Sequence, residues 1–345
     1  MTRSRLAAAA MVLGAVAVLI YTLARPSPRQ ATTPGDGAST GAAASKDTLA
    51  ALAAVPHVLF RHTGRDNTYS RMAIVALADT AGARQFTSLA CERIAFGGGA
   101  GGHGICLQAH RGMFTTYEAV LFDAAFAPTA TLKLEGPPTR TRVAPNGRVG
   151  AITTFVVGRD QGYESFGFST RTILVDLTNG QTIANLEQFK AERDGRPFTA
   201  PDFNFWGVTF ANDSNTFYAT VMTNRQTYLV RGDVSRKTLT VLRSNVECPA
   251  LSPDNTRIAF KKRVGTTQAP WRFFILDLRT MQDTPVGGES RSIDDQIEWL
   301  DEGHVLYGAS RDAPSSGSDV WMAPAGGTDA PRVFLTDAES AALAR

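Results

Sequence analysis

A cluster of carboxylates near the carboxyl end of the chain is the main candidate for chemistry. Residues 294–299 read DDQIEW, and strand alternation would send Asp295 to one side and Asp294 and Glu298 to the other. Paired carboxylates can hold Ca²⁺, which takes six to eight oxygen ligands, or act as the acid and base of a hydrolase or lyase. The alternative is structural, with the acids bonding backbone N–H groups or neighbouring arginines. Both interpretations remain open on the sequence alone.

Other signs of catalysis or cofactor binding are weak. Residues 97–102 (GGGAGG) formally match the GxGxxG dinucleotide fingerprint, but the strand-like residues 105–108 (ICLQ) follow where that site needs a helix. No Cys/His spacing suggests zinc, and the five His residues stand where turn or packing roles are expected. We therefore expect no cofactor, with Ca²⁺ at the acidic cluster as the one exception considered.

A repeated hairpin pattern supplies the elements that would position these acids. Residues 142–149, 209–218, 250–260 and 298–307 each run from an apolar strand through an Asn, Asp or Gly turn into a strand rich in Ile, Val, Phe or Tyr. The pattern recurs about every 40 to 50 residues, the period of a propeller built from four-stranded blades. The count predicts an all-β, six-bladed β-propeller, with residues 294–299 on the innermost strand of the last blade.

The count of strands leaves the first blade without an innermost strand, because linker-like residues precede His57. The last blade is complete by Leu335, yet the chain continues through residues 339–345. We expect this tail to supply the missing strand and so close the ring without exposed sheet edges. Its Ala-rich composition also fits a frayed or helical end.

The amino-terminal part of the chain differs in composition from the repeated hairpins. Residues 1–5 form a basic tail, and residues 6–24 are an uncharged apolar run long enough to cross a bilayer. The positive-inside rule places Met1 in the cytoplasm. We expect an uncleaved transmembrane signal anchor, with a cleaved signal peptide as the alternative. Residues 25–54, rich in Pro, Ser, Gly and Ala, then serve as a flexible linker, and the propeller occupies residues 55–345 outside the cell membrane.

The charge distribution limits the classes of partner that the protein could bind, and the cysteine content indicates its cellular compartment. The net charge is +3 with acids and bases interspersed, which gives no basic stripe for nucleic acid. Three cysteines suit an exported chain with one disulfide. Cys91 and Cys106 flank one predicted hairpin, so adjacent strands would bring them together. Cys248 falls on a predicted inner strand, and the sequence does not decide whether it is free.

Aromatic residues in two long loops are candidates for partner contact. Residues 187–206 form an insertion whose second half is aromatic, and Phe198 has no assigned place in a blade. Trp206 is expected to begin the next blade and pack in its core. Tyr163 and Phe166 lie in a second predicted loop. Exposed loops at propeller faces commonly carry binding residues, so Phe198, Tyr163 and Phe166 are the predicted contact residues.

Two segments carry a family resemblance. Residues 251–260 (LSPDNTRIAF), followed by 274–278 (FILDL), resemble the WD40-like repeat of TolB-like six-bladed propellers. Residues 248–254 and 294–301 are similar to segments of membrane-anchored, actinobacterial TolB-like proteins. In place of the α/β domain that precedes the propeller of TolB, this sequence has the apolar segment. The resemblance implies a cell-envelope protein that acts through protein–protein contacts without established chemistry.

These observations lead to one functional expectation and one alternative. The expectation is a non-catalytic extracytoplasmic binding or scaffold module, tethered to the cell membrane through residues 6–24. Its loops would contact a cell-envelope protein or a small ligand. The alternative is a propeller enzyme, a hydrolase or lyase, that uses Asp294, Asp295 and Glu298 in the central channel. A carboxylate pair facing one cavity with shifted pKa values would favour the enzyme.

Overall fold

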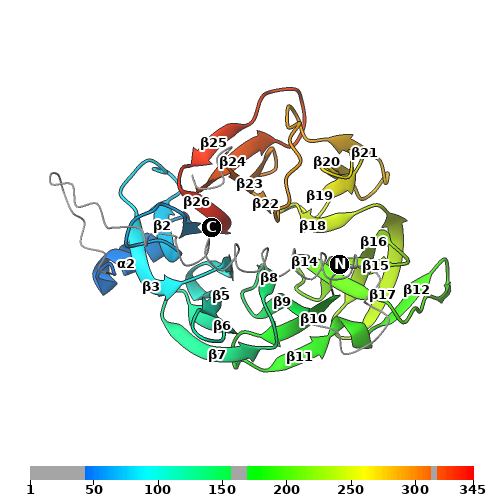
Figure 1. Ribbon diagram of the computed structural model, residues 1–345, viewed down its shortest axis with the longest axis horizontal. Coiled ribbons are helices and arrows are strands. Elements are labelled where there is room, and N and C mark those ends of the chain that lie inside the picture. Colours follow the sequence, from blue (N-terminus) through cyan, green and yellow to red (C-terminus); the bar gives the residue numbers. More distant parts are fainter. Residues whose placement is uncertain (1–42, 157–168, 312–316) are drawn as a thin grey trace, which may run out of the picture. The chain divides into compact units, whose positions relative to one another are not determined.

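Six β-sheets surround a central axis in the computed structural model, which describes residues 43–156, 169–311 and 317–345 (Figure 1). Each sheet is one blade of a propeller, and its first strand lies nearest the axis. The predicted all-β six-bladed propeller is therefore confirmed. The predicted transmembrane helix at residues 6–24 lies outside the described residues. Within the described ranges, no helix has both the length and the apolar character needed to span a membrane.

Blades 1 to 3 are four-stranded, and in each blade the strands follow one another from the axis outward. Blade 1 contains β26 (Ala338–Ala344), β1 (His57–His62), β2 (Arg71–Ala76) and β3 (Gln85–Ala90). Blade 2 contains β4 (Arg93–Gly97), β5 (His103–His110), β6 (Thr116–Asp123) and β7 (Pro128–Leu134). Blade 3 contains β8 (Pro138–Val143), β9 (Val149–Val156), β10 (Ser169–Asp176) and β11 (Thr182–Asn185).

Blades 5 and 6 are also four-stranded, whereas blade 4 has six strands. Blade 4 contains β14 (Asn204–Phe210), β15 (Thr216–Thr223), β16 (Gln226–Asp233), β17 (Thr238–Ser244), β12 (Lys190–Arg193) and β13 (Arg196–Pro197). Blade 5 contains β18 (Glu247–Leu251), β19 (Arg257–Arg263), β20 (Trp271–Asp277) and β21 (Asp283–Pro285). Blade 6 contains β22 (Glu298–Trp299), β23 (His304–Ser310), β24 (Ser318–Pro324) and β25 (Arg332–Leu335).

The recurring turn acids hold the hairpins between the first and second strands of the blades. In blade 5, the Asp254 carboxylate accepts hydrogen bonds from the Thr256 backbone N–H at 3.0 Å and from the Ser252 hydroxyl at 2.5 Å. Asn255 beside it takes a left-handed φ of 61°, which Asn tolerates better than most residues. Asp213 and Asp301 accept backbone N–H bonds in the same way in blades 4 and 6.

The carboxyl-terminal tail closes the ring. Strand β26 pairs antiparallel with β1, so that His57 lies opposite Ala344 and His62 opposite Ala338. Ala342, Leu343 and Ala344 are buried and pack in the apolar clusters that blade 1 shares with blades 2 and 6. The first blade thus takes its innermost strand from the end of the chain, as the strand count predicts, and the helical alternative for the tail is wrong.

Two further elements lie outside the four-strand plan. Helix α2 (Lys46–Ala53) begins at Ser45, whose hydroxyl accepts the Thr48 N–H, and its Leu49 and Leu52 pack against the core between blades 1 and 2. The turns η1 (Gly99–Gly101) and η3 (Leu186–Gln188) are short 3₁₀ helices. The predicted disulfide is confirmed: Cys91 and Cys106, with Cα atoms 5.2 Å apart, tie the start of blade 2 to its second strand.

Candidate functional site

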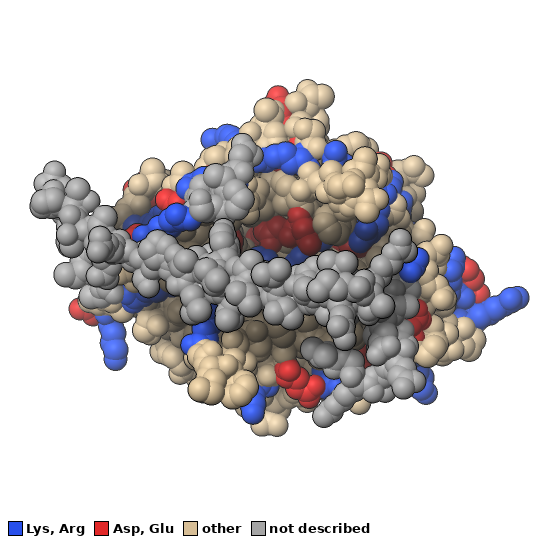
Figure 2. Space-filling view, viewed as in Figure 1, with Lys and Arg blue, Asp and Glu red and all other residues tan. Residues whose placement is uncertain are grey.

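The blades define two faces and a channel between them. We call the face formed by the loops between second and third strands the top face, and the face formed by the hairpin turns between first and second strands the bottom face. The innermost strands run from top to bottom around the channel. Figure 2 shows acidic side chains within the ring and basic side chains close beside them.

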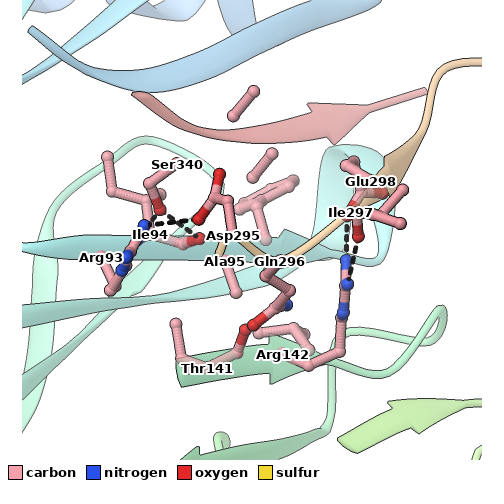
Figure 3. Close-up of a pocket in the computed structure, with 14 residues that line it drawn as sticks. Arg93, Ile94, Ala95, Thr141, Arg142, Asp295, Gln296, Ile297, Glu298 and Ser340 are labelled. Carbon is pink, nitrogen blue, oxygen red and sulfur yellow. Dashed lines mark hydrogen bonds and ion pairs between the residues drawn. The ribbon is translucent and has the colours of Figure 1, made fainter. Parts of the chain in front are cut away.

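The sequence-predicted acids do line this channel, although mostly not on a strand. Of the three acids only Glu298 belongs to β22, because the strand begins at Glu298 and residues 294–297 before it are not paired in the sheet. Asp295 is buried, and its Oδ1 accepts a hydrogen bond from Arg93 of blade 2 at 2.9 Å (Figure 3). Its Oδ2 accepts the backbone N–H of Gly308 at 2.7 Å. Both oxygens of Asp295 are thus used to hold blade 6 together and against blade 2.

Asp294 is the carboxylate partner of two cationic side chains, Arg140 and Lys261. Its Oδ1 accepts hydrogen bonds from Arg140 of blade 3, at 3.0 Å, and from Lys261 of blade 5. The Asp294 side chain is 52% exposed, whereas those of Arg140 and Lys261 are 11% and 2% exposed. One exposed carboxylate therefore serves two buried cations from two other blades.

Glu298 connects the two blades that face each other across the ring. Its carboxylate pairs with Arg142 on β8, and Arg142 also donates to the backbone carbonyl of Ile297 at 2.7 Å. The Gln296 side chain donates to the Thr141 carbonyl on the same strand, at 2.9 Å (Figure 3). Blades 3 and 6 are opposite in a six-membered ring, so these contacts bridge the channel.

The ion pairs keep the channel groups in their charged forms. Burial acts to raise the pKa of Asp294, but the charges of Lys261 and Arg140 outweigh it, so its pKa lies below the ordinary value. Burial also acts to lower the pKa of Arg140, and the neighbouring Cys248 and the two aspartates raise it by more. A carboxyl group with a lowered pKa is ionised at neutral pH and is poorly suited to donate a proton as a general acid.

The same pairing leaves the acids little capacity for a cation. Arg93, Arg140, Lys261 and Arg142 already contact the three carboxylates. Within the described part of the chain, no three His, Cys, Asp or Glu side chains come together in a metal-binding arrangement. The structural alternative considered for the acidic cluster, ion pairs with arginines between blades, is what the geometry contains.

Three cavities follow the channel from face to face. A cavity of about 60 Å³ lies at mid-depth, between Arg93, Thr141, Asp295 and Ser340 (Figure 3). The bottom mouth holds about 270 Å³ and is lined by residues of all six blades, among them Arg142, Trp299 and Arg345. The top mouth also holds a cavity of about 270 Å³, enclosed by blades 3 to 6. The bridge between Arg142 and Glu298 lies at the lining of both the mid-depth and the bottom cavities.

The predicted aromatic contact residues have different locations. Phe198 is half-buried, with its ring 5.2 Å from that of Phe203 and 5.7 Å from that of Tyr228 at the core of blade 4. Its hairpin, β12–β13, extends blade 4 at the outer edge, where β12 pairs parallel with β17. Tyr163 and Phe166 lie outside the described residues. Trp206 begins blade 4 on β14, as predicted, and is buried, but its side chain lines the top cavity of the channel, whereas the neighbouring Phe205 packs in the apolar core of the blade.

The cationic side chains that contact Asp294 are not among the residues predicted from the sequence. Arg140 and Lys261 lie on β8 and β19 of different blades, more than a hundred residues apart and just outside the predicted hairpins 142–149 and 250–260, and neither has a motif around it. The one signal available was the alternation in residues 257–263 (RIAFKKR), which places Lys261 on the same side of its strand as the apolar Ala259. A lysine at a core-facing position indicates a buried charge with a specific partner.

Comparison with known proteins identifies solved structures that share the propeller fold. No protein-family model matches the sequence, and no curated protein matches it. TolB from Acinetobacter baumannii superposes with a TM-score of 0.53 at 13% identity; the match covers 84% of this chain and 66% of that TolB. A chain of a nidogen/laminin complex superposes with a TM-score of 0.53 at 11% identity, covering 84% of this chain and 98% of that chain. At these identities the likeness shows a shared propeller fold, the six-bladed type found in TolB.

Proposed function

We propose that this protein is a non-catalytic binding module whose propeller is held outside the cell membrane and contacts its partner through the top face. The observation that carries this proposal is the distribution of exposed apolar side chains. In the described ranges, seven large apolar side chains are exposed, and five of them lie at the top face: Tyr69, Met113, Phe114, Phe155 and Val264. Exposed apolar side chains gathered on one face are typical of protein-interaction surfaces.

The most prominent of these side chains form one hairpin tip. Met113 and Phe114 join β5 to β6 and are 94% and 82% exposed. Val55, near the bottom face, and Val333, on an outer strand, are the two exceptions, and each stands alone. The apolar surface that a partner could bury is therefore concentrated at the top.

The tether and the compartment are part of the proposal. The apolar run 6–24 would anchor the chain, the predicted linker 25–54 would lead to the propeller with α2 at its end, and the propeller would stand on the extracytoplasmic side. The Cys91–Cys106 disulfide supports an oxidising compartment outside the cytoplasm. The source in the actinobacteria, implied by the sequence resemblance, stays a prediction.

The chemistry of the channel supports binding over hydrolase or lyase activity. An acid–base mechanism requires a proton donor and an acceptor that face one cavity with suitable pKa values. Asp294, Asp295 and Glu298 instead contact cations, and the lowered pKa of Asp294 disfavours its acting as an acid. One of the matched structures is a complex of nidogen and laminin, which supports a protein as the partner.

Affinity capture with matched variants tests the proposal. The propeller, residues 43–345, is immobilised as wild type, as the double variant Met113→Ser/Phe114→Ser and as the control Val333→Ser, and exposed to detergent-solubilised envelope proteins. A partner retained by the wild type and the control, but lost by the double variant, is the expected result. Retention by all three forms would place the binding surface elsewhere, and retention by none would contradict the binding role.

A further inference from the structure

The top mouth of the channel has an unbalanced set of charges around a cavity. The cavity of about 270 Å³ is lined by three cationic side chains (Arg140, Lys261 and Arg263) but only two carboxylates (Glu247 and Asp294). Glu247 is paired with Arg263 at 2.6 Å. Among the lining residues, Asp294 is therefore the carboxylate left for both Arg140 and Lys261, and the lining carries a net charge of +1.

The N–H donors of Arg140 and Lys261 also outnumber the acceptor atoms that they contact in this cavity. Arg140 and Lys261 both bond the same atom, Oδ1 of Asp294. An ammonium group has three N–H donors, and burial of Lys261 to 2% exposure is costly unless they find partners. Beside this carboxylate, Lys261 contacts the face of the Trp271 ring, with its Nζ 4.5 Å from the ring centroid. A further anionic group next to Lys261 would complete its coordination.

Aromatic side chains form the walls of the same cavity. Trp206 and Phe155 line it from blades 4 and 3, and Trp271 lines it from blade 5. Trp271 contacts a second cation as well, since the Arg263 guanidinium is 5.1 Å from its ring centroid. The indole N–H of Trp271 is buried and has no hydrogen-bond partner within the described residues. A buried donor without a partner is unusual in a folded protein, and a ligand oxygen would satisfy it.

We propose that the top cavity binds a small organic anion with a flat apolar body, such as an aromatic carboxylate. The charged end contacts Lys261 and Arg140, and the flat body packs against Trp271 and Trp206. The cavity lies just below the usual range for ligand pockets, about 300 to 1,000 Å³, which fits a ligand of one or two rings. This inference deepens the binding role proposed above by naming a ligand class at the same face.

Titration with matched small probes tests the inference. Benzoate carries the proposed charge and ring, and benzamide has nearly the same shape without the charge. In ¹⁵N-labelled propeller, the four tryptophans give four indole N–H signals, and Trp271→Phe assigns that of Trp271. Benzoate should shift the Trp271 signal and leave those of Trp299 and Trp321 in place, since only the first of these three lines the cavity. Benzamide should bind at least about tenfold more weakly.

Substitutions then test whether the charge of Lys261 contributes to benzoate binding, independently of any effect on folding. Lys261→Met should weaken benzoate binding about tenfold to a hundredfold, as expected for loss of a charged hydrogen bond. Arg257→Met is the matched control, because Arg257 stacks on Trp299 at 5.1 Å near the bottom face and should leave benzoate binding unchanged. Should Lys261→Met not fold, the salt dependence of wild-type binding replaces it, with weaker binding expected at higher salt.

The outcomes separate the anion site from the protein-binding role. No Trp271 shift with benzoate, equal binding of benzamide, or a uniform shift of all four signals would each overturn the inference. The captured partner and its dependence on Met113 and Phe114 would be unaffected by those results. Loss of the partner result with intact benzoate binding would contradict the protein-binding role and leave the anion site standing.

Discussion

The guanidinium of Arg142 in blade 3 pairs with the carboxylate of Glu298 in blade 6, directly across the propeller channel. The two side chains are 13% and 25% exposed. A second contact from Arg142 to the Ile297 carbonyl and one from Gln296 to the Thr141 carbonyl reinforce the bridge. Opposite blades are thus joined through the channel as well as through their neighbours around the ring.

Removing one partner of this bridge should destabilise the propeller. Glu298→Gln leaves the mostly buried Arg142 without its counter-charge, for which we expect a loss of about 1 to 3 kcal/mol in the free energy of unfolding. The melting temperature should fall by about 3 to 10 °C, as monitored by circular dichroism.

Glu302→Gln is the control for that measurement. Glu302 pairs with Arg257 at 2.9 Å, but its side chain is 49% exposed, and surface ion pairs contribute about 0 to 1 kcal/mol. Equal effects of the two substitutions would show that the bridge across the channel adds nothing beyond a surface pair.

Ring closure by the tail gives a second prediction. Deleting residues 338–345 removes all of β26 and exposes the inner edge of β1, so we expect a fall in melting temperature of about 10 °C or more, or aggregation. Adding a synthetic peptide of residues 338–345 should restore part of the loss. A truncated protein that melts like the full-length chain would refute closure by β26.

The disulfide closes a short loop, because Cys91 and Cys106 are 15 residues apart. The chain-entropy model assigns a loop of this length about 3 kcal/mol. Cys91→Ala/Cys106→Ala should therefore lower the melting temperature. The denatured wild type should contain one reactive thiol, that of the buried Cys248, and three after reduction. Three thiols without reduction would contradict the bridge.

A buried carboxylate in the segment between blades 5 and 6 predicts a specific response to acid. Burial acts to raise the pKa of Glu289, but hydrogen bonds from Arg291 and the Tyr307 hydroxyl lower it by more, so its pKa lies below the ordinary value. A lowered folded-state pKa contributes stability that is fully present above the unfolded pKa, about 4.3, and is lost as the pH falls through the folded value.

Glu289→Gln should consequently destabilise the protein at pH 7 by about 1 to 3 kcal/mol, since Arg291 and Tyr307 lose a charged partner. Between pH 5 and 3 the variant should lose stability less steeply than the wild type. Urea unfolding at several pH values measures both effects. Parallel curves for the two proteins would show that Glu289 contributes no pH dependence.

The blades and their closure were predictable because they depend on local signals and on counting. The turn acids Asp213, Asp254 and Asp301 mark hairpins by their own hydrogen bonds to nearby backbone N–H groups. A first blade with one strand too few requires a strand from elsewhere, and only the tail remained. The Cys91–Cys106 pair followed from their positions around one hairpin.

The channel was less predictable because its contacts depend on the closed ring. Whether Asp294 meets a metal or the pair Arg140 and Lys261 is set by the radius of the ring and by strand registers, which no short segment encodes. The break of β22 at Ile297 was missed for the same reason, since residues 294–297 leave the sheet to reach Arg140 and Thr141 across the channel. The parallel pairing of β12 likewise has no signature in its alternation.

Site-specific photocrosslinking in cells tests the central claim most directly. A photoreactive amino acid is placed at position 114 on the top face, or at position 333 on an outer strand, in the full-length chain. A binding module that uses its top face should give a discrete crosslinked adduct from position 114 and none from position 333. No adduct from position 114, or an equal adduct from position 333, would contradict the proposed binding face.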